Sequence, residues 1–360
     1  MEKAVYRYFA CANSCRGFVS HFDSALWDKE RVFILKGGPG TGKSTLMRGI
    51  GEYFLEQGEE VEYIYCSSDA TSLDGVVLAN RKIAVVDGTA PHIIEPSAPG
   101  ACEEYVNLGI AWNREKLVPY REEIRMLKAQ ISKEYQEMYH NLASAKEIHD
   151  RWEQIYLENL DFDKLNQAAE NLLGLVFDSV PFAGKQTTAV HRFFGALTPD
   201  GSVNHIENLT EGLNTRYFIK GRPGCGKSTL MKKLAARGEE LGQKVEVYHC
   251  SFDPDSVDMV LLRELGICVF DATPPHELFP SREGDVLVDL YGFAVHTNTD
   301  EENAEALSLI AGEYTREIKG ARSHLSRVQH LHHALEEYYI HAVDFRKIEQ
   351  TMEDLIREIE

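Results

Sequence analysis

The chain has 360 residues, and its 38 basic and 57 acidic side chains give a formal charge of -19. Such a negative surface repels phosphate backbones, so a broad nucleic-acid-binding face is not expected. No apolar run is long enough to span a membrane, no N-terminal stretch has the pattern of a secretion signal, and the seven cysteines form no dense framework. We therefore expect a cytoplasmic protein without a membrane partner.

In chain order, the first half alternates strand-like apolar runs with helix-like runs. Strands are expected at residues 6–10, 31–35, 61–65 and 83–86, with a helix after the second strand as far as residues 57–58 and another helix between the last two strands. The second half repeats the order, with strands at residues 191–196, 216–219, 245–248, 267–270 and 286–290. This alternation favours an α/β fold with a parallel sheet flanked by helices and with ligands at the carboxyl ends of the strands.

A glycine-rich loop follows the second strand of each half and precedes a helix. Both loops match the pattern G-x-x-x-x-G-K-[ST]. The glycines let backbone N–H groups turn toward one anion, and the helix N-terminus adds the positive end of its dipole. The loops predict two sites for the phosphates of a nucleoside triphosphate, formed by Gly37, Gly38, Pro39, Gly40, Thr41, Gly42, Lys43, Ser44 and Thr45 and by Gly221, Arg222, Pro223, Gly224, Cys225, Gly226, Lys227, Ser228 and Thr229.

Within the loops, two residue types are expected to act on the reaction. Lys43 and Lys227 would reach the terminal phosphates, where a positive charge assists phosphoryl transfer. Ser44 and Ser228 would place their hydroxyls on Mg²⁺, which prefers oxygen ligands and shares them with the nucleotide. The expected cofactors are therefore ATP, or another nucleoside triphosphate, and Mg²⁺.

Four aspartates are candidates for work on the same phosphates. Asp87 and Asp271 each end a strand downstream of a loop, where an aspartate holds the Mg²⁺ shell; a turn at the strand end is the alternative. Asp69 and Asp253 are expected to follow the strand beside the loop strand. A carboxylate there could orient water or accept a hydroxyl proton, and a turn or helix cap is an equal alternative.

Five further residues carry both a functional and an ordinary interpretation. His92 and His276 each follow a proline and either contact a terminal phosphate or are satisfied inside a turn. Arg7 and Arg192 recur at similar places, so one half could present an arginine to the nucleotide of the other, although a surface role is favoured. Arg222 lies in the second loop, where the first loop has glycine, so the halves are not chemically equivalent.

The last part of each half has the pattern of a long amphipathic helix. Apolar residues recur at three- and four-residue steps from Leu117 to Leu142 and from Tyr314 to Tyr339. We expect a helical hairpin or coiled-coil arm at about 112–175 and another at about 302–360. Packing on the nucleotide domains or on each other is the expected role, and contact with a protein partner is the alternative.

Histidines on the second arm have the pattern of a solvated helix face. They are His330, His332 and His333, and His149 of the first arm aligns with one of them. This alignment alone does not predict a metal site.

The two loops belong to a repeat that covers nearly the whole chain. The offset that aligns Lys43 with Lys227 also aligns residues 17–97 with residues 201–281 without a gap, including Asp74 with Asp258. We therefore expect two tandem domains, 1–184 and 185–360, each long enough to bury its own core. Proline and glycine at residues 181–184 indicate the seam.

The loops and their flanks resemble the P-loop NTPase superfamily, and the pattern G-x-P-G-x-G-K-[ST] is similar to that of AAA-type ATPases and nucleotide kinases. The tandem order, with Asp-[Gly/Ala]-Thr-x-Pro-His in each half and Thr-Pro-Asp-Gly at residues 198–201, is similar to a bacterial family of duplicated P-loop proteins described as ATPase-like or ATP-binding. The resemblance implies two tandem P-loop NTPase domains. Vigorous ATPases of the AAA or RecA type usually have a glutamate beside the strand-end aspartate, where this chain has Gly88 and Ala272.

Three functions fit these residues. The leading expectation is Mg²⁺-dependent ATP binding with slow hydrolysis, which rearranges the two nucleotide domains and their arms. A kinase that moves the γ-phosphate to a small acceptor is the second, favoured by the missing glutamate. A nucleotide-gated interaction module without turnover is the third. Base preference stays open, because the loop contacts phosphate rather than base.

Overall fold

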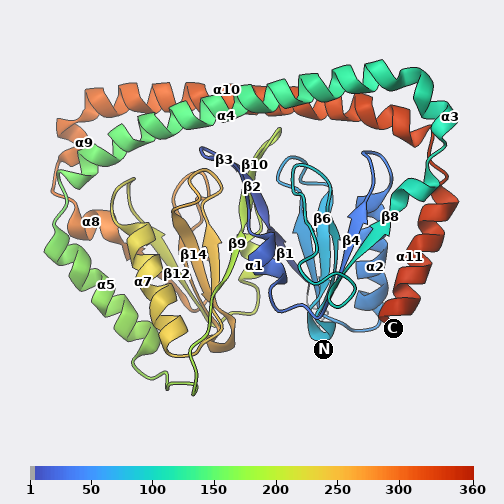
Figure 1. Ribbon diagram of the computed structural model, residues 1–360. Helices are drawn as coiled ribbons and strands as arrows, with labels where there is room; N and C mark the ends of the chain where they lie inside the picture. The colour runs from blue at the N-terminus through green and yellow to red at the C-terminus, as the bar shows by residue number, and fades with distance from the viewer. Residues whose placement is uncertain (1–4) are drawn as a thin grey trace.

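The computed structural model describes residues 5–360 and shows an α/β fold in which a large mixed sheet is flanked by helices (Figure 1). The sheet has 12 strands in the order β16-β12-β15-β14-β13-β9-β1-β5-β6-β7-β4-β8. Two separate pairs of strands, β2 with β3 and β10 with β11, lie outside it. The predicted α/β class is therefore confirmed.

The elements of the first half (residues 5–184) and the second half (residues 185–360) follow in chain order. The strands are β1 (Val5–Phe9), β2 (Cys11–Ser14), β3 (Gly17–Ser20), β4 (Arg31–Lys36), β5 (Val61–Tyr65), β6 (Leu73–Leu78), β7 (Ile83–Asp87), β8 (Glu103–Asn107), β9 (Val190–Phe193), β10 (Gly195–Thr198), β11 (Gly201–Asn204), β12 (Thr215–Lys220), β13 (Glu246–His249), β14 (Val257–Leu262), β15 (Ile267–Asp271) and β16 (Asp285–Asp289). The helices are α1 (Phe22–Leu26), α2 (Lys43–Glu56), α3 (Arg114–Leu117), α4 (Arg121–Leu157), α5 (Phe162–Phe177), α6 (Ile206–Leu209), α7 (Lys227–Glu240), α8 (Leu290–Ala294), α9 (Thr299–Glu302), α10 (Ala304–Ile340) and α11 (Phe345–Ile359).

The sheet is mixed, so the expectation of a parallel sheet is wrong. β6 and β14 run antiparallel to both of their neighbours. The helix expected between residues 65 and 83 is instead the strand β6, whose sequence LDGVVL is buried along its whole length. An antiparallel strand needs only a short reversing loop, whereas a parallel strand needs a crossover of about a dozen residues or more. The chain between β5 and β7 therefore forms a third strand rather than a helix.

The two halves share one sheet and part of one core. β1 and β9 pair antiparallel at Phe9 and Phe193, and the strands on either side of this pair follow matching orders. One buried apolar cluster contains Tyr8 and Ile34 of the first half together with Phe218 of the second half. Each half also has an apolar cluster built on its own strands, and the shared cluster lies where the central pair of strands joins the two sheets into a continuous layer.

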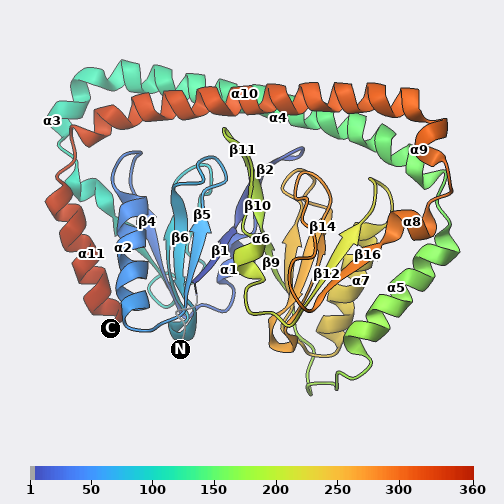
Figure 2. The ribbon, with the colours of Figure 1, turned by 180° about the vertical axis from the view of Figure 1, so that it is seen from behind.

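The long helices α4 and α10 lie side by side and antiparallel across the sheet edge that carries the glycine loops (Figures 1 and 2). Met138 and Leu142 of α4 pack with Ala321, Leu325 and Val328 of α10 in a buried seam. The predicted amphipathic helices are confirmed, and they pack mainly on each other. None of the helices in residues 5–360 combines the length and the apolar character that crossing a bilayer requires.

The C-terminal helix of each arm packs on the opposite half of the chain. α5 of the first half packs on α7 of the second half, and α11 of the second half packs on α2 of the first (Figure 1). Leu172 and Val176 of α5 enter the apolar cluster of the second half, while Ile348 and Leu355 of α11 enter that of the first. The two halves are therefore bound by crossed arms, and each arm passes the glycine loop of the opposite half.

Candidate phosphate sites

Each glycine loop is a tight turn between a strand of the sheet and a helix. The first loop (residues 37–45) joins β4 to α2, and the second loop (residues 221–229) joins β12 to α7. Gly40 and Gly42 have φ angles of 66° and 80°, and Gly224 and Gly226 have φ angles of 78° and 75°. Residues with a Cβ rarely adopt this left-handed conformation, so the turn requires glycine at these points. The predicted context of strand, loop and helix is present at both loops.

The loop lysines occupy the same environment in both halves. The Nζ atom of Lys43 donates to the carbonyl oxygens of Gly37 and Gly38, at 3.2 Å and 2.9 Å, and lies 3.5 Å from Oδ2 of Asp87. In the second half, Nζ of Lys227 donates to two carbonyl oxygens of its own loop, at 2.8 Å and 3.0 Å, and lies 3.5 Å from Oδ2 of Asp271. Both lysines thus hold a positive charge between the loop and the strand-end aspartate.

The strand-end aspartates are oriented by the threonine two residues later. Oδ1 of Asp87 accepts hydrogen bonds from the backbone N–H and the hydroxyl of Thr89, at 2.9 Å and 2.6 Å. Asp271 accepts the corresponding bonds from Thr273, at 3.0 Å and 2.5 Å. The other oxygen of each carboxylate faces the loop lysine. The turn role and the predicted role beside the phosphates are therefore compatible, because they use different oxygens.

The serines at the start of the two helices contact the adjacent antiparallel strands. The hydroxyl oxygen of Ser44 accepts a 3.0 Å hydrogen bond from the backbone N–H of Leu73, and that of Ser228 accepts a 2.9 Å bond from Val257. Leu73 begins β6 and Val257 begins β14. The serine hydroxyls are thus held at the edge of the sheet, each one residue after a loop lysine.

Two further aspartates, Asp74, which is buried, and Asp258, which is partly buried, lie at the same edge and were not predicted to act. Asp74 and Asp258 are the second residues of β6 and β14. Burial raises the pKa of Asp74, and the charge of Asp87 adds to this effect while His92, 3.5 Å away, opposes it. Burial and the neighbouring charge of Asp271 raise the pKa of Asp258 to about 7. Their recurrence at aligned positions was the available signal in the sequence.

The predicted position of Asp69 and Asp253 is corrected by the strand order. Their strands, β5 and β13, are not beside the loop strands, because β6 and β7 separate β5 from β4, and β14 and β15 separate β13 from β12. Each of the two aspartates lies in a turn of its own half. Asp69 accepts hydrogen bonds from the backbone N–H and hydroxyl of Thr71 and from the hydroxyl of Ser72. Burial alone would raise the pKa of Asp69, but these hydrogen bonds lower it below its usual value. The turns are nevertheless connected to the candidate site, because each leads directly into the strand whose first residue donates a hydrogen bond to the loop serine.

The histidines and arginines that recur in the two halves are not gathered at the loops. His276 is buried against Phe194, with ring centroids 4.8 Å apart, and burial lowers its pKa to about 4. Arg192 is buried in the central sheet, 3.0 Å from Glu62 and 3.4 Å from Glu246.

These contacts decide the arginine hypothesis. Arg192 is buried and pairs with carboxylates of both halves, so the favoured surface role is wrong and the alternative, presentation to a nucleotide, does not fit it either. Arg7 lies on β1, and its backbone N–H donates to Asn208. Arg222 of the second loop pairs with Asp300 at 2.6 Å.

The arm of one half lies directly against the glycine loop of the other. A Cβ atom built on Gly40 would lie 3.0 Å from the carbonyl oxygen of Glu336 in α10, and one built on Gly224 would lie 2.8 Å from the carbonyl oxygen of Glu153 in α4. Tyr339 of α10 approaches Gly38 in the same way. The sequence did not indicate this contact, although the alignment of the two arms carries both glutamates at matching positions.

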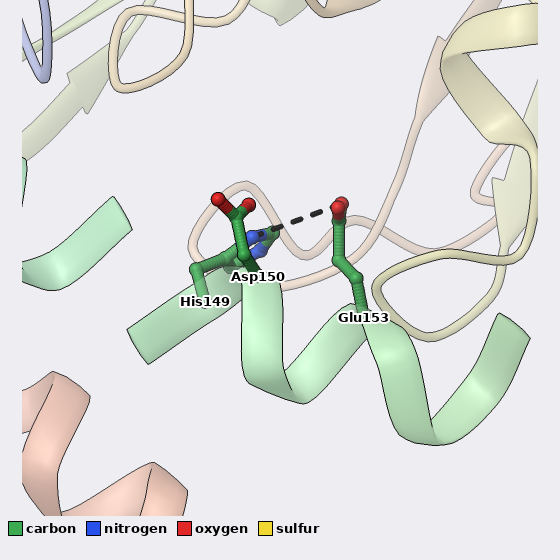
Figure 3. Close-up of side chains that lie close together, drawn as sticks. All are labelled: His149, Asp150 and Glu153. Carbon is green, nitrogen blue, oxygen red and sulfur yellow. Dashed lines mark ion pairs between the residues drawn. The ribbon is translucent and has the colours of Figure 1, made fainter. Parts of the chain in front are cut away.

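Each arm also carries a histidine four residues before its glutamate. In α4, Nδ1 of His149 lies 3.7 Å from Oε1 of Glu153, and Figure 3 shows both side chains and Asp150 extending from the same side of the helix. In α10, Nδ1 of His332 lies 3.4 Å from Oε1 of Glu336. Burial raises the pKa of Glu153, against the charges of Lys146 and Lys227. The carboxyl group of Glu153 therefore lies within the electrostatic reach of the opposite loop's lysine.

Two cavities lie along the arms rather than at the glycine loops. One of about 910 Å³ is lined by residues of α4, α10 and the segment before α4, including Tyr120, Leu127 and Tyr338. The other, of about 650 Å³, is lined by Trp112, Asp344 and their neighbours. Neither lining contains a residue of the two loops. We base the candidate phosphate sites on the loop geometry and not on these hollows, since an anion at a helix N-terminus needs backbone donors rather than an apolar cavity.

A comparison with protein families gives a partial match. The family model described as Nephrocystin 3, N-terminal, matches residues 13–85, which include the first glycine loop and amount to less than half of the chain. Comparisons with curated proteins and with solved structures gave no match. The first half is therefore similar to that N-terminal domain over the segment from β2 to β7.

Proposed function

We propose that the protein binds ATP, or another nucleoside triphosphate, with Mg²⁺ at two P-loop NTPase sites, one in each half, and hydrolyses it slowly. The proposal is carried by one arrangement that occurs twice. A lysine lies between loop carbonyls and a strand-end aspartate, beside a serine at the start of a helix. An isolated glycine turn would not require this set of charged and hydroxyl groups at both places.

The residues present fit the proposed cofactors. The glycines of each loop adopt the left-handed conformation that lets successive N–H groups face one anion. Serine hydroxyls and aspartate carboxylates are the hard oxygen ligands that suit Mg²⁺. Ser44 and Asp87 would hold the ion in the first half, and Ser228 and Asp271 in the second. When bound, Mg²⁺ neutralises charge on the β- and γ-phosphate oxygens.

The chain's own groups would each contribute separately to binding and reaction at the phosphates. The loop N–H groups and the N-termini of α2 and α7 bind the phosphate oxygens. Lys43 and Lys227 compensate the charge that develops on the terminal phosphate. The threonine bonds to Asp87 and Asp271 fix each carboxylate, so its second oxygen stays directed to the site. Asp69 and Asp253 remain predicted as catalytic groups through their turns beside the serines.

A kinase activity is the second candidate, because no carboxylate follows the strand-end aspartates directly. A Cβ built on Gly88 would collide with the side chain of Ile34, which leaves no room for a larger residue without a shift of that neighbour. Ala272 occupies the corresponding position and is buried. A site without a water-activating group in this position is compatible with transfer of the phosphoryl group to an acceptor hydroxyl. A nucleotide-gated interaction module without turnover is the third candidate.

Nucleotide binding by the variants Lys43→Ala and Lys227→Ala tests the proposal. Loss of a charged hydrogen-bonding group should weaken ATP binding at its own site by about 10- to 100-fold. Phosphate release without an acceptor supports hydrolysis, whereas ATP consumption only with an added acceptor supports the kinase. Tight binding with neither reaction supports the gated module. If neither substitution weakens binding of ATP and Mg²⁺, the proposed function is wrong.

A further inference from the structure

The crossed arms bring a glutamate of one half to the glycine loop of the other. The backbone of Glu153 contacts the loop of Lys227 at Gly224, and the backbone of Glu336 contacts the loop of Lys43 at Gly40. The chain has no glutamate beside the strand-end aspartates, where Gly88 and Ala272 stand. The arms therefore bring the backbone of this residue type to both loops in trans, and the charge of Lys227 acts on the carboxyl group of Glu153.

The same histidine accompanies the glutamate at both places. His149 and Glu153 are 3.7 Å apart between Nδ1 and Oε1, and His332 and Glu336 are 3.4 Å apart between the same atoms. Both glutamates are partly buried, although each lies on a helix with many solvated acidic residues. A solvated helix face does not require the same pair, at the same spacing and against the same glycine, on two different helices.

A metal site explains this repetition less well. His149, Asp150 and Glu153 offer ligand atoms within 4.8 Å of one another (Figure 3). The arm of the second half has His333 at the position of Asp150, so the pair recurs and the triad does not. Asp150 is also exposed and forms an ion pair with Lys146. The recurring element is thus the histidine and glutamate pair.

We propose that Glu153 and Glu336 are the carboxylates that activate water in the phosphate site of the opposite half, and that His149 and His332 are positioning residues that orient them. This inference rests on the proposed function. Glu153 serves the site of Lys227, and Glu336 serves the site of Lys43. Each site is consequently complete only when both halves contribute to it.

The proposed step is a hydrolysis that uses only water and the nucleotide. The glutamate accepts a proton from water while the water oxygen forms a bond to the γ-phosphorus. The bond from the γ-phosphorus to the bridging oxygen breaks, and its electron pair leaves with the nucleoside diphosphate. The proton held by the glutamate then passes to the released phosphate or to solvent, which restores the carboxylate. The neighbouring lysine compensates the negative charge during the transfer.

The test uses the full chain with one loop disabled at a time. In the Lys43→Ala background only the second site remains, and Glu153→Gln should lower its single-turnover hydrolysis rate by about 100-fold, as expected for loss of a general base. In the Lys227→Ala background, Glu336→Gln should do the same to the first site. Glu153→Gln in the Lys227→Ala background should leave the rate unchanged, because Glu153 faces the disabled loop.

Matched controls separate chemistry from folding. Glu147→Gln and Glu337→Gln change exposed glutamates of the same two helices and should leave both rates unchanged. ATP affinity should stay within about twofold in the glutamine variants, since glutamine keeps the shape of the side chain and loses only the base. The acid-side fall of the pH–rate profile should disappear in Glu153→Gln. His149→Gln should shift that fall without changing ATP affinity, because it alters the orientation of the carboxylate and its charge.

The outcomes distinguish this inference from the proposed function. If the lysine variants retain full ATP binding, the proposed function fails and the inference fails with it. If the lysine variants lose binding and the glutamine variants keep wild-type hydrolysis, only the inference is overturned. Binding without any phosphate release overturns the inference together with the hydrolysis part of the proposed function, and it leaves nucleotide binding standing. A loss of ATP affinity in Glu153→Gln equal to the loss of rate would show a structural role and would overturn it too.

Discussion

Lys146 of the first half pairs with Asp253 of the second half, with 3.5 Å between Nζ and Oδ2. The pair crosses from α4 to the turn that precedes β14, whose first residue, Val257, donates to Ser228 of the second glycine loop. The aligned position in α10 is Gln329, which carries no charge. The two candidate phosphate sites therefore differ in the charge that the opposite arm brings to them, although their loops are alike.

This difference predicts unequal hydrolysis by the two sites. In the Lys43→Ala background, Lys146→Gln should lower the hydrolysis rate of the second site by about tenfold, equivalent to about 1.4 kcal/mol of transition-state stabilisation. The matched change Gln329→Ala in the Lys227→Ala background should have little effect. Single-turnover assays on both sites measure the contrast, and equal effects of the two changes would contradict it.

The contact between α4 and the second glycine loop predicts that a substitution at Gly224 will destabilise the protein. Gly224→Ala should destabilise the protein by about 1–3 kcal/mol, because its left-handed backbone is strained for alanine and the new Cβ meets the carbonyl of Glu153. Gly212→Ala is the control, since Gly212 has a φ of 73° and nothing within 4 Å of a built Cβ.

Denaturant unfolding of the two variants measures the difference. The alanine at Gly224 should also weaken ATP binding at the second site, whereas the control should not. Equal destabilisation by both substitutions, with ATP binding intact, would show that the arm does not press on the loop.

The buried pair of Arg216 and Asp285 predicts a pH-dependent part of the stability. Arg216 donates from Nε and one terminal nitrogen to the two carboxylate oxygens of Asp285, both at 2.8 Å, and both side chains are 1 % exposed. Hydrogen bonds from Arg216 hold the pKa of Asp285 well below its usual range, although burial opposes this. A lowered folded-state pKa means that the stabilisation is present above the unfolded-state pKa of about 3.9 and is lost as the pH falls below it.

Asp285→Asn should therefore lower the free energy of unfolding by about 1–3 kcal/mol at neutral pH, because the buried arginine loses one of its two charged partners and keeps Glu207. The variant should also lose part of the acid sensitivity below about pH 4. Urea unfolding from pH 3 to pH 7 measures both effects. Parallel pH profiles of the variant and the wild type would contradict the assignment.

The buried seam between α4 and α10 predicts that its apolar side chains stabilise the packing of the two arms. Leu325→Ala should cost about 2–5 kcal/mol, because Leu325 is fully buried between α4 and α10. Leu309→Ala is the control on the same helix, since Leu309 is 64 % exposed. Thermal unfolding should separate the two variants, and a loss of hydrolysis in Leu325→Ala beyond its loss of stability would indicate that a docked arm is needed for turnover.

Local patterns were sufficient for the parts of the site that lie close together in the chain. The spacing from Gly37 to Ser44 predicts loop, lysine and helix start, because all of them belong to one turn and its first helical residues. The position of Asp87 could be predicted for the same reason, because it ends a short apolar strand. The helix expected before β7 was wrong, because a short run of apolar residues such as Leu73–Leu78 does not reveal whether it forms a strand or a buried helix.

The sequence by itself determined that two glycine turns, each with a lysine, would join a strand to a helix, since φ freedom, helix N-termini and charge are properties of neighbouring residues. It also determined that two long helices would have an apolar face. Only the tertiary structure decided that β1 and β9 would join the halves and that the arms would cross, so that Glu153 lies at Gly224 and Glu336 at Gly40. An apolar stripe specifies that a helix must be covered but not by what, and the partner is chosen by the burial that the whole chain achieves together.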